Sequence, residues 1–453
     1  MMASRFILAM LPKPEASPLI VLSTDRMPLR PLLPILGITL LLGACGTVTR
    51  APDLALRSIA TPLAPAADPR LAPTEPIRPP SLSCAEPRPC ARAHPPILLA
   101  LSGGGANGAY GAGVLIGWTE RGDRPEFDIV TGVSTGALSA PFAFLGDDWN
   151  DQLANAYLGA RTSGILSWRS FAAFALPGLF SPRTLEGLIE ENVTPDLLRA
   201  VADEHRRGRR LYVGTTNLDD GQPVIWDMGL IATQGDANAL TLFRQVLMAS
   251  ASIPGVFPPV LIAGLDDDGV VRQQMHVDGA VTAAFIGVPV GTMLDAAATA
   301  DWSGAELYVI VNGRIAVLKH RTPGGIRAIA ERSIAVTGAA ALTANLQNQA
   351  IFADMAGATL AVAAIPHDAD PADLRFDRNQ MANLMQKGRD LARDGRAFTS
   401  FSRSMAEAPT QPTGAAPEPA EAVEETDRNE PLPVVEGEAS VAEVGAASSI
   451  PED

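Results

Sequence analysis

The most constraining feature of this sequence is a glycine-rich loop that follows a short apolar segment. Residues 97–101 are apolar throughout, as expected for a strand buried in a sheet. Gly103, Gly104 and Gly105 come next, and the small residues that begin with Gly108 indicate a helix. Glycines permit a sharp turn, and the N–H groups at the start of a helix favour negative charge. The stretch therefore predicts an anion site for either a nucleotide phosphate or a catalytic oxyanion.

Beyond the glycine loop, apolar strands alternate with helices as far as about residue 404. This alternation predicts an α/β fold with a mostly parallel central sheet and helices on both faces. Residues 219–222 are typical of a turn, so residues 223–226 should return as the antiparallel partner of 211–218. Further strands are expected at 127–131, 275–278, 306–312 and 358–365, and helices up to 120 and at 132–144, 149–204, 237–249, 325–354 and 377–393.

Composition limits the classes of partner. The chain has 453 residues, is 47% hydrophobic and carries a net charge of −15, which argues against a nucleic-acid partner. Residues 406–453 hold 12 acidic residues and one basic residue, so the rest of the chain has a net charge of only −4. The acidic tail, residues 405–453, has no hydrophobic periodicity and is predicted to be disordered.

The N-terminal segment has the features of an export signal. Arg26 and Arg30 precede an apolar run, residues 31–42, that is too short to span a bilayer. The Leu-Gly-Ala-Cys45 sequence that follows resembles the bacterial lipobox. This resemblance implies cleavage before Cys45 and a diacylglyceryl group on its sulfur. An ordinary signal peptide with an unrelated cysteine is the alternative.

Translation starts at Met1 or Met27, since residues 1–26 add nothing that a signal needs. Residues 1–44 form the expected signal peptide of lipoprotein type. The mature protein is then expected in the bacterial cell envelope, lipid-anchored at the outer membrane and facing the periplasm or the surface.

A tether is expected between the lipid and the folded domain. Residues 45–95 are rich in Pro and Ala and predict an extended, weakly ordered segment. Cys84 and Cys90 lie within it, and in an oxidising compartment they are expected to form a small disulfide loop, with two free thiols as the alternative. The domain that follows is expected to span residues 96–404.

A serine and an aspartate stand where strands are expected to end. Ser134 lies in a Gly-x-Ser-x-Gly stretch at a strand-to-helix turn, where small neighbours leave the hydroxyl clear and the helix N-terminus favours an oxyanion. A serine nucleophile needs a base. Asp278 ends another strand, at the kind of position where the sites of α/β proteins collect, although an Asp before Gly is also common in turns.

None of the five histidines has a setting that suits a catalytic base. His94 lies in the tether, and His205 precedes the basic run 206–210, which is expected to be a solvated loop or a patch facing lipid headgroups. The other three, in settings that are neither glycine-rich nor turn-rich, are His276, His320 and His367.

Three motifs in this order resemble the patatin-like phospholipase family. They are the Gly-Gly-Gly-x-x-Gly loop, the Gly-x-Ser-x-Gly stretch and a downstream Asp-Gly-Ala. Residues 249–259 also look like the block that this family has between its serine and its aspartate, and the resemblance covers residues 96–365. The further positions that carry the motifs are Gly108, Gly132, Gly136, Gly279 and Ala280.

The resemblance implies a Ser-Asp dyad without histidine. Ser134 would be the nucleophile and Asp278 the base, while the N–H groups of Gly103, Gly104 and Gly105 would form the oxyanion hole. The implied reaction is hydrolysis of fatty-acyl esters of the phospholipase A or lysophospholipase type, through an acyl-serine and without metal or cofactor. The implied substrate is a membrane lipid or another lipid ester.

Two further features concern the expected substrate. Many members of the family have Arg or Lys where this chain has Asn107, so the site is less positive and a strong preference for anionic headgroups is not expected. The apolar segment 165–180, which holds one tryptophan and three phenylalanines, is a candidate wall or lid for an acyl chain, or plain core.

Three other functions are open at this stage. An α/β-hydrolase esterase with Ser134, Asp278 and either His320 or His367 fits the order of residues in the chain. A nucleotide-binding protein would use the spacing of Gly103, Gly105 and Gly108, although no acidic residue follows a second strand where a ribose would need it. A lipoprotein without activity would bind lipid or a partner through its tail.

Overall fold

The computed structural model describes residue 50 and residues 69–71, 94–159, 182–265, 270–315, 321–372 and 376–401. These residues belong to the first of two units, Met1–Ala408. The predicted signal peptide, Cys45, Cys84, Cys90, the apolar segment 165–180 and the acidic tail lie outside the described residues.

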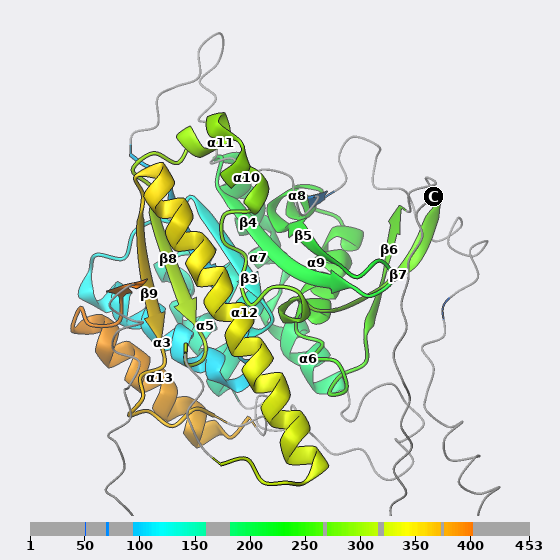
Figure 1. Cartoon of the computed structure of the whole chain (residues 1–453). Helices are drawn as coiled ribbons and strands as arrows, with labels where there is room; N and C mark the ends of the chain where they lie inside the picture. The colour runs from blue at the N-terminus through cyan, green and yellow to red at the C-terminus, as the bar shows by residue number, and fades with distance from the viewer. Residues whose placement is uncertain are drawn as a thin grey trace, which may run out of the picture. The chain divides into compact units, whose positions relative to one another are not determined.

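The predicted, mostly parallel sheet is confirmed and forms the centre of the fold (Figure 1). Five strands run parallel in the order β4-β3-β2-β8-β9. Their bounds are Ile97–Leu101 for β2, Ile129–Val133 for β3, Arg210–Asn217 for β4, Glu306–Val311 for β8 and Thr359–Ala364 for β9. Because these strands are parallel, they all end at one edge, which we call the carboxyl edge.

Antiparallel strands extend the sheet. The predicted hairpin is confirmed, because β5 (Gln222–Asp227) pairs antiparallel with β4. β1 (Arg70–Leu71) pairs with β5, so these two residues of the predicted tether form part of the sheet. β10 (Thr399–Ser400) pairs with β9. The hairpin of β6 (Val260–Leu265) and β7 (Val271–Asp278) attaches to the last residues of β4 and brings Asp278 opposite Thr215.

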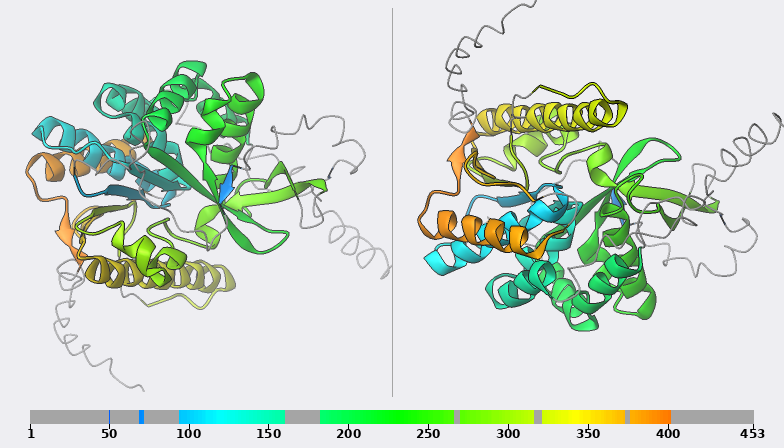
Figure 2. Two further views of the ribbon diagram at one scale, coloured as in Figure 1. Left: turned by 90° about the horizontal axis from the view of Figure 1, so that it is seen from above. Right: turned by 90° about the horizontal axis from the view of Figure 1, so that it is seen from below.

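Helices cover both faces of the sheet (Figure 2). A hydrophobic core lies on each face. Side chains alternate along a strand, so Leu99 and Leu101 of β2 enter one core while Leu98 and Ala100 enter the other. The described helices of the first face are α3 Gly108–Arg121, α4 Thr135–Leu145, α5 Asn150–Leu158, α6 Arg183–Asn192, α7 Pro195–Arg206, α8 Met228–Thr233, α9 Ala237–Ser250 and α13 Arg378–Arg393.

The second face is covered by α10 (Val290–Leu294) and the long α12 (Ile326–Ala356), with α11 (Ala296–Ala300) beside them. Helices on both faces were predicted, and they are confirmed. Within the described residues, no helix has both the length and the apolar character needed to cross a membrane.

Candidate active site

Ser134 stands in the tight turn between β3 and α4. Its φ is 56°, and Phe376 is the only other non-glycine residue with a positive φ in the described part of the chain. A Cβ on Gly132 would lie 2.6 Å from the carbonyl oxygen of Gly136, and one on Gly136 would lie 2.4 Å from that of Leu101. The glycines of the Gly-x-Ser-x-Gly stretch therefore have a steric cause, since only glycine lets β3 turn so sharply into α4.

Asp278 is the last residue of β7, and it meets Ser134 directly. Ser134 Oγ donates a hydrogen bond to Asp278 Oδ2 at 2.5 Å, and the Ala280 N–H donates to Asp278 Oδ1 at 2.8 Å. A Cβ on Gly279 would lie 2.5 Å from the carbonyl oxygen of Gly214, so this turn also requires glycine. Both side chains are buried, and together they form a hydrogen-bonded Ser-Asp pair.

Burial sets the basicity of this pair. It raises the pKa of Asp278 to about 6, although the hydrogen bonds from Ser134 and Ala280 lower that pKa in part. A carboxylate with a raised pKa is a better acceptor for the proton of a hydroxyl, and it is still ionised at neutral pH. The environment of Asp278 therefore suits a general base.

The last residue of α9 and the segment that follows it connect the two members of the pair. Ser250 Oγ accepts a hydrogen bond from the Ser134 N–H at 2.9 Å and donates one to the carbonyl oxygen of Gly214 at 2.6 Å. The carbonyl oxygen of Ser252 accepts a hydrogen bond from the Asp278 N–H at 3.0 Å. Sequence reasoning missed Ser250, and its only signal was its place in the family-like block 249–259.

Asn312, which follows β8, is hydrogen-bonded to residues on either side of the glycine loop. Its Nδ2 donates to the carbonyl oxygen of Ser102 at 2.8 Å, and its Oδ1 accepts from the Gly111 N–H at 3.1 Å. A Cβ on Gly104 would lie 2.0 Å from the carbonyl oxygen of Asn312, so the loop approaches too closely for any side chain there. No role of Asn312 was predictable from the sequence, because nothing local distinguishes an asparagine at a strand end.

The glycine loop lies against Ser134, since a Cβ on Gly103 would be 3.2 Å from Ser134 Cβ. The Gly103 N–H, however, donates to the carbonyl oxygen of Ala284 at 3.1 Å. It is not free for an oxyanion, which corrects the expectation for this residue. The N–H groups of Gly104 and Gly105 meet no acceptor among the described residues. Two of the three expected donors therefore fit the role.

Asn107 holds another part of the chain against the glycine loop. Its Oδ1 accepts a hydrogen bond from the Ala372 N–H at 2.7 Å. A basic side chain has no acceptor to offer this N–H group. The contact accounts for an amide at this position.

An apolar pocket opens beside Ser134, on the face covered by α4, α5, α6 and α9. The space between its walls is ≈ 730 Å³, including the part that is open to solvent. Thr135 and Tyr157 are polar residues of its wall, and their hydroxyl groups are hydrogen-bonded to each other at 2.8 Å. The Tyr157 hydroxyl also lies 3.0 Å from the carbonyl oxygen of Thr135, to which it donates. Such a pocket suits an alkyl chain. Its apolar walls include Leu138, Phe142, Leu185, Leu188, Ile189 and Leu247.

No described histidine is hydrogen-bonded to Ser134. His276 bonds Thr215 Oγ1 through Nδ1 at 3.0 Å, and burial lowers the pKa of His276 to about 4. His205 Nδ1 lies 3.6 Å from Asp227 Oδ1. His320 lies outside the described residues. Among the described residues, no three His, Cys, Asp or Glu side chains converge as a metal site requires.

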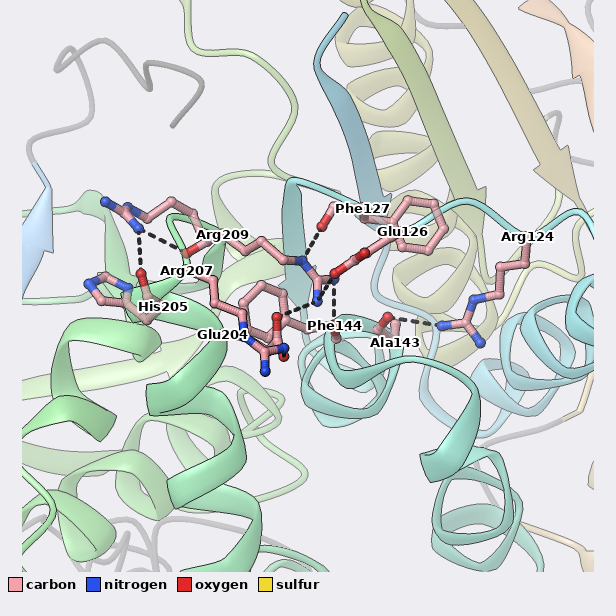
Figure 3. A network of polar contacts seen from close by, with 10 residues as sticks. Arg124, Glu126, Phe127, Ala143, Phe144, Glu204, His205, Arg207 and Arg209 are labelled. Atoms are coloured by element: carbon pink, nitrogen blue, oxygen red, sulfur yellow. Dashed lines mark hydrogen bonds and ion pairs between the residues drawn. The ribbon is translucent and has the colours of Figure 1, made fainter. Parts of the chain in front are cut away.

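Two arginines hold the far end of α4, the helix that begins after the serine (Figure 3). Arg124 donates to the carbonyl oxygen of Ala143 at 2.9 Å, and Arg209 donates to that of Phe144 at 2.6 Å. Cations at a helix C-terminus satisfy its last carbonyls and complement the helix dipole. The expectation of a solvated or headgroup-facing run at 206–210 is therefore wrong for Arg209, which stabilises the interior.

Comparison with known proteins gives a family match over part of the chain. The model of the family described as "Patatin-like phospholipase" matches residues 99–291, which include the glycine loop, Ser134 and Asp278. No curated protein matches the chain. Among solved structures, the crystal structure of VipD from Legionella pneumophila matches with a TM-score of 0.31 and 13% identity, over 68% of each chain. Residues 99–291, less than half of the chain, thus match the patatin-like phospholipase domain.

Proposed function

We propose that this protein is a serine lipid acyl hydrolase that cleaves fatty-acyl esters of the phospholipase A or lysophospholipase type. The match of residues 99–291 to the patatin-like phospholipase family supports lipid acyl hydrolysis in general. The single observation that carries the finer proposal is the 2.5 Å hydrogen bond from Ser134 Oγ to Asp278 Oδ2 beside an apolar pocket.

In the first half of the reaction, Asp278 removes the proton of Ser134 while Oγ attacks the ester carbonyl carbon. The Gly104 and Gly105 N–H groups then donate to the oxyanion of the tetrahedral intermediate. One such donor contributes about 3–4 kcal/mol of transition-state stabilisation in comparable sites. The ester C–O bond breaks, the leaving alcohol takes the proton from Asp278, and the acyl group stays on Ser134.

In the second half, water attacks the acyl-serine and passes a proton to Asp278. The oxyanion is held by the same two N–H groups. When the acyl C–O bond to Ser134 breaks, the proton returns to Oγ and the fatty acid leaves. The direct Ser134–Asp278 contact supports a mechanism that needs no histidine between nucleophile and base.

The apolar pocket would hold the acyl chain. Its walls come from the ordered helices α4, α5, α6 and α9, and its mouth adjoins Ser134. The segment 165–180, which the sequence analysis offered as an acyl-chain wall, lies outside the described residues.

Fatty-acid release from phospholipid and lysophospholipid by the purified full chain tests the proposal. Ser134→Ala and Asp278→Asn should each reduce release by at least about a hundredfold, because each removes a group that acts in the transition state. Ser303→Ala, at an exposed position just before β8, is the matched control and should leave release unchanged. Undiminished release by either site variant would refute the proposal.

We further propose that a lipid on Cys45 anchors the protein in the bacterial envelope, which would bring the enzyme to a membrane substrate. The lipobox-like sequence before Cys45 supports this. Labelled palmitate should be incorporated into the parent chain and not into Cys45→Ala. Equal incorporation into both would contradict the anchor.

A further inference from the structure

The N-terminal half of α12 extends past the carboxyl edge (Figure 1). Ser134, which directly follows β3, lies at the same edge. The helix connects the parallel strands β8 and β9, so it begins at the carboxyl edge and returns to the opposite edge. Its C-terminal half packs on the sheet through Leu346 and Phe352. A helix of 31 residues is about 46 Å long and a strand of six is about 20 Å long, so much of α12 lies beyond the sheet.

This overhang, residues 326–341, is apolar and uncovered. None of its described side chains is buried. Ile326 and Ile334 are 88% and 74% exposed, and Ile329 and Val336 are also exposed. Isoleucines that repeat along a helix usually enter a core, so a set that faces water indicates a contact with another body.

The charge of the overhang and of the sequence before it indicates which kind of partner the overhang contacts. Residues 307–353 hold five Lys or Arg residues and one acidic residue, in a chain whose net charge is −15. Arg327 and Arg332 lie on the overhang with the acidic residue, Glu331, and the other three basic residues precede it. Apolar helices with basic residues lie in the headgroup region of anionic bilayers. A second copy of the chain fits less well, because a symmetric dimer through the overhang would bring two basic segments together.

The rim of the candidate active site supports the same orientation. Val281 follows Asp278 by three residues and is half exposed beside Ala280, which is also exposed. These residues and the overhang both belong to the carboxyl edge. A flat lipid surface laid against that edge would meet them without a change in the fold.

We propose that the α12 overhang is an interfacial helix that seats the carboxyl edge on an anionic phospholipid surface, from which a lipid ester enters the apolar pocket. The second half of this statement rests on the proposed function, whereas the first half does not.

A fluorophore on the overhang tests the binding without any need for enzymatic activity. The full chain would carry Ile334→Cys, with Cys45, Cys84 and Cys90 replaced by Ser so that no lipid anchor can be attached and one site is labelled. A polarity-sensitive dye there should shift to the blue with vesicles of phosphatidylcholine and phosphatidylglycerol, and much less with phosphatidylcholine alone. The matched control is Ile351→Cys, exposed on the packed half of the same helix, which should show no shift.

Activity gives the second measurement. The double variant Ile326→Ser and Ile334→Ser should hydrolyse anionic vesicles about tenfold more slowly and a soluble short-chain ester at the parent rate, because only interfacial binding is weakened. The matched double variant Ile351→Ser and Met355→Ser should behave as the parent with both substrates.

Three results would overturn the proposal. They are the same dye response at residues 334 and 351, an equal response to neutral and anionic vesicles, and a shift at residue 334 that appears without vesicles as the protein dimerises. If no substrate of any kind is hydrolysed while the shift at residue 334 persists, the proposed function fails and interfacial binding stands.

Discussion

The surroundings of Asp278 disfavour its ionisation, because its carboxylate is buried beside Ser134. Its pKa is raised to about 6 by burial. A general base acts in its ionised form, so kcat/KM for a soluble ester should rise with pH, reach half its maximum near pH 6 and stay level above that. A pH-rate profile measures this. A half-maximum near pH 4, the ordinary value for an aspartate, would show that the carboxylate is not buried in the working enzyme.

The same carboxylate should destabilise the fold at neutral pH. The pKa of Asp278 is higher in the folded protein, at about 6, than its ordinary value of 3.8, so the folded state binds this proton more tightly. The stabilisation from this proton is complete below about pH 4 and is lost as the pH rises through about 6. The free energy of unfolding falls by roughly 2–3 kcal/mol over that range.

Asp278→Asn should therefore abolish activity and raise the melting temperature at about pH 8, but not at about pH 4. Thermal denaturation at both pH values measures the difference. Asp148→Asn, at an exposed carboxylate, serves as the control and should change neither value. A lower melting temperature of Asp278→Asn at the higher pH would contradict this reasoning.

At the scale of elements, the turn from β3 to α4 depends on a side chain from α9. Ser250 is hydrogen-bonded to the Ser134 N–H and to the Gly214 carbonyl oxygen. Ser250→Ala leaves both buried groups unpaired, at a cost of about 1–3 kcal/mol each. It should lower kcat about tenfold to a hundredfold with little change in KM, because Ser134 is misplaced while the pocket persists.

Ser252→Ala is the matched control for Ser250→Ala. Its hydroxyl bonds only the carbonyl oxygen of Met248, one turn earlier, and its contact with Asp278 is made by the backbone. Steady-state kinetics of both variants distinguish a positioning role from a general loss of stability. Equal losses in the two variants would remove the special role of Ser250.

The glycine loop should tolerate no side chain at Gly104. Gly104→Ala puts a Cβ 2.0 Å from the carbonyl oxygen of Asn312, so the loop must move and the oxyanion donors move with it. Activity should fall about a hundredfold or more, as for the loss of an oxyanion donor. Gly313→Ala is the control, since a Cβ there meets nothing within 4 Å, and hydrolysis assays on both variants give the comparison. Parent-like activity of Gly104→Ala would show that the loop does not act in catalysis.

The elements also show how far sequence reasoning reaches. β2 was predictable because a strand covered on both faces is continuously apolar. The strand predicted at 127–131 is present as β3, two residues later. The glycines that the tight turns require lie next to Ser134 and Asp278, and they made both residues recognisable in the sequence. Ser250, Asn312 and the partner of the Gly103 N–H were not predictable, because each acts on residues more than 100 positions away, where no local pattern applies.

At the scale of the whole molecule, the sheet brings distant parts of the chain to one edge. β2 delivers the glycine loop, β3 delivers Ser134, and β8 delivers Asn312, all as parallel strands that end together. Asp278 enters from an antiparallel strand of the β6–β7 hairpin, which the sequence did not predict. The mostly parallel fold and the strand that ends at Asp278 were thus predictable, whereas the antiparallel pairing of that strand with β4 and β6 was not.

The central claim is that Asp278 activates Ser134 directly, and labelling of the folded full chain with a fluorophosphonate tests it best. The account predicts an adduct on Ser134, located by mass spectrometry, that forms at least about a hundredfold more slowly in Asp278→Asn. Replacement of His205, His276, His320 or His367 by Ala, one at a time, should leave the labelling rate close to that of the parent. Absence of an adduct on Ser134, or a histidine variant as slow as Asp278→Asn, would contradict the claim.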